Sequence, residues 1–250
     1  MLKDFLQLNN LRGLIMGDYC TDVFVYGSCD RLSPEAPVPV FLESNRIVMD
    51  GMAGNVKNNF AQFTDNFDFI YSGEGTEKTR FVDKRSNQQL LRIDKEIDFC
   101  ELKIPNNLNQ YDYFIVSDYC KGSITDKVIN VITKTNKPVF VDSKRKDLNI
   151  FKDSIIKINE KESKECDISD KNNLVITLGS KGAMWNNKLF ETEKVEVRDV
   201  SGAGDTFFAC FVAKYLCTKS FESSIKFANI CASSVVKKSG TSVINLKEII

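Results

Sequence analysis

Five short apolar runs, each followed at once by polar residues, constrain the fold of this chain more than any other feature. Such runs are typical of strands that are buried on both faces of a parallel sheet. They are Leu14–Met16, Tyr113–Val116, Val139–Val141, Ile155–Ile158 and Leu174–Ile176. The polar residues after them are, in the same order, Gly17-Asp18, Ser117-Asp118, Asp142-Ser143-Lys144, Asn159 and Thr177-Leu178-Gly179. Because open α/β sheets bind ligands at the carboxyl ends of their strands, we expect a binding site along this edge.

Segments with helical periodicity lie between the predicted strands, including Thr125–Thr135 and Phe221–Lys237. This alternation of strands and helices predicts a parallel sheet. Two other regions, about 22–48 and 78–94, show alternating or β-branched residues without a helical period. We assign them to a small β lid. No repeat or long linker interrupts residues 1–250, so we expect a single domain.

The segment DVSGAGDT, residues 199–206, is the most informative for chemistry because it precedes the apolar run FFACFVAKYL, which predicts a buried helix. Its small residues are Ser201, Gly202, Ala203 and Gly204. They leave backbone N–H groups uncovered at a helix N-terminus, where the partial positive charge favours a phosphate. We expect the same charge to keep Asp205 ionised and able to take a proton from an alcohol. On its own, the segment also fits an ordinary glycine-rich turn with a capping aspartate.

Composition narrows the class of partner. With 250 residues and 42% apolar content, the chain can bury a full core. Its 34 Lys and Arg residues balance 34 Asp and Glu residues, so no net field draws it to nucleic acid or an anionic membrane. The N-terminal MLKDFLQLNN carries charge too early for a signal peptide. We therefore expect a cytoplasmic protein that binds a small molecule, with neither nucleic acid nor membrane as a partner.

Cysteine and histidine usage limits the chemistry further. The eight cysteines include no C-x-x-C pair, and their spacing fits neither a disulfide framework nor a zinc site, so we expect reduced thiols. The chain has no histidine, which removes the commonest general base and the commonest zinc ligand. Carboxylates must therefore perform any acid or base step.

The pattern D-x-x-G-A-G-D-x-F at residues 199–207 matches a signature of the ribokinase-like (PfkB) carbohydrate kinases, which the chain resembles. Further segments are GDYCTDVFVYG, RLSPEAPVPV, KTRFVDKRSNQQLLRID, FIVSDYCKG, VDSKR and KFANICASSVVKKSGTS. In order along nearly the whole chain, they resemble the kinase part of bacterial heptose 7-phosphate kinase/adenylyltransferase proteins. The resemblance implies an α/β fold, a ribokinase-like three-layer α/β/α sandwich with a mainly parallel sheet and a small β lid.

The same resemblance implies a reaction. The γ-phosphate of ATP would pass to the anomeric hydroxyl of D-glycero-D-manno-heptose 7-phosphate and give the 1,7-bisphosphate. This step lies on the route to ADP-heptose and the lipopolysaccharide inner core. We expect the kinase step alone, because no segment here matches the adenylyltransferase half.

The resemblance also assigns residues to the nucleotide side. Asp205 matches the catalytic base, and Gly202, Ala203 and Gly204 match the anion hole for the migrating phosphoryl group. An N-x-x-E motif that organises Mg²⁺ through its waters corresponds to Asn159, Glu160, Lys161 and Glu162. The nucleotide-binding loop corresponds to Thr177, Gly179, Lys181 and Gly182, although a tight β-turn explains these residues equally well. The border of the adenine and ribose pocket corresponds to Asn229 and Gly240-Thr241, with a helix-surface amide as the alternative for Asn229.

On the sugar side, the resemblance implies that Asp18 and Asp22 hydrogen-bond to sugar hydroxyls, although capping or turn formation also accounts for them. A glycine-rich substrate loop corresponds to Gly51, Gly54 and Asn55, with Met52 and Lys57 in place of the usual small residues. A phosphorylated sugar also needs cations, because its dianion loses hydration in a closed pocket. The lid candidates are Lys78, Arg80, Arg85 and Arg92. We expect Arg85, together with Gln88, to make this contact.

Two segments, 59–76 and 162–174, are shorter than the family pattern, so we expect a fold compacted by loss of a strand-helix unit. This shortening and the altered GMAGNVK loop leave two alternatives open. One is a kinase of another sugar phosphate or nucleoside, and the other is a ribokinase-like binding or regulatory protein. The retained Asp205 favours an active kinase, because binding alone would need no base.

The lid also predicts an oligomer. Its apolar residues Phe24, Val38, Val40 and Phe41 are expected to be exposed, and the edges of the lid strands require covering. We therefore expect a homodimer that forms through the lid.

Overall fold

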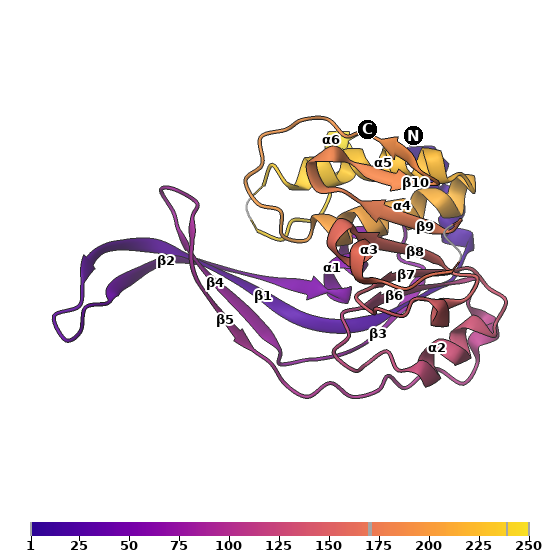
Figure 1. Ribbon diagram of the computed structural model, residues 1–250, viewed down its shortest axis with the longest axis horizontal. Coiled ribbons are helices and arrows are strands. Elements are labelled where there is room, and N and C mark those ends of the chain that lie inside the picture. The colour runs from indigo at the N-terminus through magenta and orange to yellow at the C-terminus, as the bar shows by residue number, and fades with distance from the viewer. Residues whose placement is uncertain (1, 170–171, 239, 250) are drawn as a thin grey trace.

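The computed structural model describes residues 2–169, 172–238 and 240–249 (Figure 1). A sheet flanked by helices forms the body, and a long β lid extends from it (Figure 1). Strand β1 (Gly13–Leu32) belongs to both parts, because it pairs with body strands at its start and with lid strands after residue 18. We expected a body strand ending near Gly17 and a separate lid segment from Asp22. The structure instead has one continuous strand of 20 residues.

The body sheet runs in the order β3-β1-β6-β7-β8-β9-β10-β11. Its remaining strands are β3 (Phe67–Ser72), β6 (Tyr113–Asp118), β7 (Val139–Ser143), β8 (Ile155–Asn159), β9 (Leu174–Thr177), β10 (Ala183–Trp185) and β11 (Lys188–Phe190). Neighbours from β3 to β9 are parallel, and β10 and β11 continue the sheet in antiparallel pairing. All five predicted apolar runs lie in these strands, which confirms the mainly parallel sheet.

Helices cover both faces of the body sheet. One face carries α1 (Ala53–Phe60), α4 (Ala203–Thr218), α5 (Phe221–Val235), α6 (Leu246–Ile249) and the 3-10 helix η1 (Leu2–Asn10). The other face carries α2 (Asp126–Thr133) and the short turns η2 (Leu108–Gln110) and η3 (Asn149–Phe151). The predicted helices at 125–135 and 221–237 correspond to α2 and α5. These layers confirm the three-layer sandwich.

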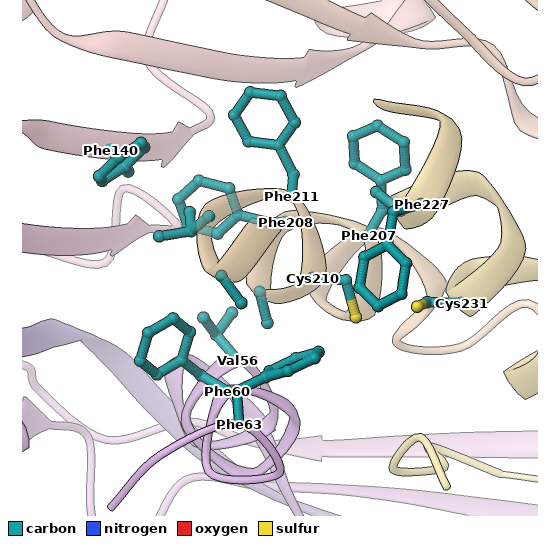
Figure 2. Packing of buried hydrophobic residues seen from close by; sticks show 14 of the residues in the cluster. Val56, Phe60, Phe63, Phe140, Phe207, Phe208, Cys210, Phe211, Phe227 and Cys231 are labelled. Carbon is teal, nitrogen blue, oxygen red and sulfur yellow. The ribbon is translucent and has the colours of Figure 1, made fainter. Parts of the chain in front are cut away.

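Helix α4 is apolar on nearly every side because it lies between the sheet and two other helices. Figure 2 shows its phenylalanines Phe207, Phe208 and Phe211 among side chains of α1, β7 and α5. All three are almost completely buried. Deleting such a side chain costs about 3–5 kcal/mol, so this packing fixes the helix and the turn that precedes it.

The lid sheet has the strand order β2-β1-β4-β5. Its other strands are β2 (Pro39–Met52), β4 (Glu77–Asp83) and β5 (Gln89–Lys95). The predicted lid regions therefore exist, with β2 running four residues further than expected, into the N-terminus of α1. The side chains of Asp22, Phe24 and Tyr26 alternate with their neighbours on β1 and share a face with Lys78, Arg80 and Val82 of β4.

The apolar surface of the lid differs in part from the prediction. Val38 is exposed, and Val40 and Phe41 are half-buried. The prediction that Phe24 is exposed is wrong. This side chain is 1% exposed, and the Arg80 guanidinium lies 5.0 Å from the centre of its ring. The exposed apolar side chains of the lid strands include Leu42, Val48, Leu90, Leu91 and Ile93.

The chain is shortened where the sequence predicted. Only residues 73–76 separate β3 from β4, so the chain enters the lid directly after an edge strand. Helix α3 (Glu160–Glu165) has six residues and is followed closely by β9. Each connection is too short to hold a further strand and crossover helix.

All eight cysteines are free thiols, as their spacing predicts. In the described ranges, the helices lack the length and apolar character that crossing a membrane requires.

The β9–β10 connection gives a test of the fold. Gly182 has φ +100°, and an added Cβ would lie 2.1 Å from the Phe190 carbonyl oxygen. Gly182→Ala should therefore lower the free energy of unfolding by roughly 2 kcal/mol or more. Gly179, in the same turn, has φ +58° and open space around it, so Gly179→Asn should cost about 1 kcal/mol or less. Urea unfolding measures both, and equal losses would contradict the described turn.

Candidate active site

The carboxyl ends of the body strands bring the predicted polar residues together. In the strand register, Gly17 is paired with Ser117, and Ser117 with Asp142. Asp142 is in turn paired with Lys157, and Asn159 with Thr177. The residues that follow separate apolar runs in the sequence thus form one polar edge, as expected.

Asp205 faces this edge from the first turn of α4 and is almost completely buried. The Asn55 amide of α1 donates a hydrogen bond to Oδ2 at 2.9 Å. The hydroxyl of Tyr119, just after β6, donates to Oδ1 at 2.8 Å. Two hydrogen bonds from different elements therefore fix the carboxylate in one orientation.

Burial moves the pKa of Asp205 in the direction opposite to the one expected from the helix N-terminus. Desolvation, followed by the negative charge of Asp142, raises the pKa of Asp205 to about 6. The hydrogen bonds from Asn55 and Tyr119 and the positive charge of Lys157 act against this rise. The helix N-terminus therefore does not set the pKa, although the carboxyl still ionises below pH 7. A carboxylate with a pKa near neutrality is a better proton acceptor than an ordinary aspartate.

The turn before α4 offers free backbone donors. Among the described residues, the N–H groups of Gly202, Gly204 and Asp205 have no hydrogen-bond acceptor. The N–H of Ala203, which was predicted to be part of the anion hole, donates to the Val200 carbonyl at 3.2 Å. The free donors therefore differ from the predicted anion hole, because the Asp205 N–H is free and the Ala203 N–H is not.

Gly202 must be glycine for this turn to form. Its φ is +76°, and an added Cβ would lie 2.5 Å from the Asn55 amide nitrogen and 2.7 Å from Thr241 Cγ2. The turn therefore packs directly against α1 and the C-terminal segment.

Lys157 is a functional candidate that sequence reasoning missed. It is buried in β8, and its ammonium donates to Asp142 Oδ2 at 2.8 Å. An added Cβ on Gly204 would lie 3.1 Å from Lys157 Nζ, so the ammonium lies beside the free amides. Burial is the largest single influence and would lower the pKa of Lys157, but the charge and hydrogen bond of Asp142, together with the charges of Asp205 and Glu162, leave the pKa raised. The available signal was a lysine inside the apolar run at 155–158.

Tyr119 was also missed, although it directly follows the Ser117-Asp118 strand end. Burial and the charge of Asp205 hold the pKa of Tyr119 well above its usual range, so it remains a donor to Asp205. Two ammonium groups lie near its ring: Lys144 Nζ at 4.0 Å and Lys78 Nζ at 5.7 Å from the centroid. Lys144 belongs to the polar residues after β7, and Lys78 to the lid.

The two predicted sugar-binding aspartates have different surroundings. Asp18 is fully buried, and its oxygens accept hydrogen bonds from the backbone of Tyr119 and Lys121 and from Ser123. Asp18 therefore holds the 119–123 loop. Asp22 accepts from Arg80 at 2.6 Å and lies beside Thr241, at the base of the lid.

The glycines of the predicted substrate loop lie against β1. An added Cβ on Gly51 would be 2.5 Å from Asp22 Oδ2, and one on Gly54 would be 2.8 Å from Tyr19 Cε2. Both glycines thus allow β2 and α1 to approach the base of β1. Asn55 is close to the candidate base, as described above.

On the predicted magnesium side, Asn159 and Glu162 form a capping box at the start of α3. Asn159 Oδ1 accepts from the Glu162 N–H at 2.9 Å, and Glu162 Oε2 accepts from the Asn159 N–H at 2.8 Å. Glu160 and Lys161 are exposed. The second carboxylate oxygen of Glu162 accepts no hydrogen bond from the described residues.

The predicted nucleotide loop forms a tight connection between β9 and β10. The 3-10 turn η4 (Gly179–Lys181) is closed by hydrogen bonds from Leu178 N–H to the Gly182 carbonyl and from Gly182 N–H to the Gly179 carbonyl. Thr177 Oγ1 donates to the Ile158 carbonyl. The backbone therefore has the β-turn geometry that we considered as the alternative, with Lys181 exposed.

Two residues assigned to the adenine border have structural partners. Asn229 is buried and donates to the Phe190 carbonyl at 2.8 Å, so it is not a surface amide but anchors β11 to α5. The Gly240 N–H donates to Asp199 at 3.0 Å, and Gly240 lies beside Phe24 at the base of the lid.

The lid cations divide into two groups. Arg85 and Gln88 are exposed in the turn between β4 and β5, where Arg85 pairs with Asp30. The structure does not bring them to the polar edge. Lys78, Arg80 and Arg92 instead share the lid face that carries Asp22.

Comparison with known proteins agrees with this architecture. A family model described as pfkB family carbohydrate kinase matches residues 66–248. The bifunctional protein HldE of Sulfurimonas denitrificans is 31% identical, with 100% of this chain and 65% of the relative covered. HldE of Campylobacter curvus is 32% identical, over 94% of this chain and 64% of the relative. The chain thus spans about 65% of the length of these curated relatives.

Solved structures show the same fold at low sequence identity. Ribokinase of Arabidopsis thaliana, complexed with ribose and ATP, has a TM-score of 0.67 at 16% identity, covering 96% of this chain and 97% of that chain. Phosphofructokinase-2 of Escherichia coli, in complex with substrates and products, has a TM-score of 0.68 at 13% identity, covering 96% of each chain. These likenesses confirm the predicted fold class.

The hydrogen bond from Tyr119 to Asp205 gives a spectroscopic test. Because this bond favours the ionised carboxylate, Tyr119→Phe should move the pKa of Asp205 above about 6. The measurement is a carbon-13 NMR titration of the carboxyl group. Tyr113→Phe is the matched control, because the buried Tyr113 hydroxyl has no hydrogen-bond partner among the described residues. An unchanged or lower pKa in Tyr119→Phe would contradict the assignment.

Proposed function

Since the chain belongs to the pfkB family of carbohydrate kinases and is a sugar kinase, we propose that it phosphorylates D-glycero-D-manno-heptose 7-phosphate at its anomeric hydroxyl, with ATP as the donor. The HldE relatives and the sequence segments shared with bacterial heptose 7-phosphate kinases support this acceptor. The single observation that carries the chemistry is the oriented Asp205 carboxylate in the same helix turn as three free backbone N–H groups.

Asp205 is the proposed general base. It takes the proton of the sugar hydroxyl while the sugar oxygen forms its bond to the γ-phosphorus of ATP. The bond from that phosphorus to the oxygen bridging to the β-phosphate breaks, and its electron pair leaves with ADP. With a pKa of about 6, Asp205 is mostly ionised at neutral pH and can accept this proton.

The N–H groups of Gly202, Gly204 and Asp205 are the proposed anion hole. Amides that already point to one place need no rearrangement as charge develops on the phosphoryl oxygens. Lys157 adds a fixed positive charge beside Gly204, and its bond to Asp142 holds it there. This arrangement supports phosphoryl transfer over binding alone.

The residues near α3 fit a magnesium ion held mainly by the nucleotide. In the described parts of the chain, no three acidic or thiol side chains come close enough to chelate a metal. Glu162 has one carboxylate oxygen outside the capping box, and carboxylate oxygen is a ligand type that Mg²⁺ and its waters prefer. We assign Glu162, with Asn159 orienting it, to the ion that neutralises phosphate charge.

The lid face supplies the proposed contacts to the acceptor. We assign Asp22 to sugar hydroxyls because it lies on the lid face, whereas Asp18 is fully buried under the 119–123 loop. For the sugar's own phosphate, Arg80 and Arg92 replace Arg85, since their strand register puts them on the face shared with Asp22. Arg80 is held by Asp22 and stacks on Phe24, so its position is fixed before the substrate arrives.

Release of ADP tests the proposed reaction. The wild-type protein should release ADP with heptose 7-phosphate in preference to hexose phosphates, free sugars and nucleosides. Asp205→Asn should lower kcat by about 10²- to 10⁴-fold, because it removes the general base. The exposed Asp65→Asn is the control and should change little.

Two outcomes would count against the proposal in different ways. If the protein preferred another acceptor, the heptose assignment would be wrong and the assignment as a kinase would remain. Near-normal turnover by Asp205→Asn would remove the base assignment.

We also propose a homodimer through the lid, supported by the exposed apolar side chains of its strands. Light scattering at micromolar concentration should give twice the 28.3 kDa chain mass. The double variant Leu91→Glu, Ile93→Glu should shift the protein to the monomer, because it charges neighbouring exposed positions on β5. Val131→Glu, on the exposed face of α2, is the control. A monomeric wild type would exclude this assembly.

A further inference from the structure

Two lysines near the candidate base have no anionic partner within ion-pair distance among the described residues. Lys78 of the lid and Lys144 after β7 both approach the Tyr119 ring, at 5.7 Å and 4.0 Å from its centroid. Neither forms an ion pair with any residue that the structure describes. By contrast, the other lid cations on this face are neutralised, Arg80 by Asp22 and Arg92 by Asp94.

The charges that act on Lys144 come from several sides of the candidate site. The Lys144 side chain reaches the surface, and partial desolvation of its ammonium lowers its pKa. The charge of Glu162 acts against this, and the charge of Lys78 lowers the pKa further. Asp142 and Asp205 also act on it. The ammonium therefore lies within electrostatic reach of the magnesium candidate on the nucleotide side and of the base and the lid on the sugar side.

Bringing two ammonium groups together at one ring is unfavourable unless an anion joins them. Like charges in a partly desolvated site repel, and the ring face offsets only part of this cost. A phosphoryl group has the charge and the several oxygens needed to accept from both lysines. The hydroxyl on the same ring already binds the Asp205 carboxylate, so such an anion would lie beside the reacting atoms.

We propose that Lys78 and Lys144 bind the phosphoryl group as it passes from ATP to the sugar, and that this shared anion fastens the lid to the body. The proposal rests on the proposed kinase function and adds two catalytic residues to it. The free N–H groups of Gly202, Gly204 and Asp205 would bind the phosphoryl oxygens at the N-terminus of α4. Lys78 would bind them from the lid, and Lys144 from the segment after β7.

The proposal couples chemistry to lid closure. Lys78 lies on β4, which joins the body through β1 and the short 73–76 connection. Without an anion, repulsion between the lysines favours an open lid, and with the anion both ammonium groups are drawn to one point. Closure would then be favoured only when a transferable phosphoryl group is present.

Nucleotide binding tests the proposal without any sugar. Calorimetry compares MgADP with the magnesium complex of AMP-PCP, an ATP analogue whose third phosphate is not transferred. Lys144→Met and Lys78→Met should each weaken AMP-PCP binding about tenfold, as loss of a charge-assisted hydrogen bond predicts, and change MgADP binding less than about twofold. Lys144→Arg should restore most of the AMP-PCP affinity, because it keeps the charge.

The matched controls are Lys84→Met in the lid and Lys146→Met near β7, both exposed, which should bind both nucleotides as the wild type does. Thermal unfolding confirms that each variant is folded. In turnover, the double variant Lys78→Met, Lys144→Met should lose less than the product of the two single losses, because both lysines act on one group.

Equal weakening of MgADP and AMP-PCP, or no weakening of either, would overturn the proposal. A wrong acceptor would be recognised separately. In that case heptose 7-phosphate would cause no release of ADP, but the lysine variants would still weaken the binding of AMP-PCP more than that of MgADP.

Discussion

The buried carboxylate of Asp205, held by Asn55 and Tyr119, is the interaction on which the site depends. Burial alone would favour the neutral acid, and the two hydrogen bonds oppose this, so the pKa rests at about 6. The donors come from α1 and from the end of β6, which meet at α4 only because the body sheet and its helices pack as they do. The phenylalanines of α4 hold its N-terminus in this place, so the core and the chemistry share one helix (Figure 2).

Strand β1 connects this site to the lid. Its first residues lie between β3 and β6 in the body, and the residues after Asp18 form the lid with β2 and β4. Asp22 and Phe24 lie at the base of the lid, beside Thr241 and Gly240 of the C-terminal segment. A movement of the lid would therefore shift the proposed sugar contacts directly. The short 73–76 connection strengthens this coupling, because it leaves little chain to absorb a movement.

Sequence reasoning found the elements whose signals are local. The five apolar runs became body strands, and Asp205 lies at the start of a buried helix as the DVSGAGDT segment predicts. It could not give the partners of side chains that depend on tertiary packing. Asp18 and Asp22 look alike in the sequence, yet the 119–123 loop occupies one and Arg80 pairs with the other.

Lys157 and Tyr119 were missed for the same reason, because their roles depend on partners that tertiary packing brings to them. Lys157 stands in an apolar run, and its burial as an ammonium is explained by the ion pair with Asp142, which the run itself does not reveal. Tyr119 is one aromatic among many until the fold brings its hydroxyl to Asp205. Arg85 was favoured because of its matching segment, but strand register, which the segment does not encode, puts Arg80 and Arg92 on the inner lid face.

A crystal structure with Mg²⁺, AMP-PCP and heptose 7-phosphate measures the central claim most directly. The account predicts the third phosphate within hydrogen-bond distance of the N–H groups of Gly202, Gly204 and Asp205, and the sugar's anomeric hydroxyl on the Asp205 carboxylate. A third phosphate bound away from these N–H groups, or a sugar whose hydroxyls do not reach Asp205, would contradict it.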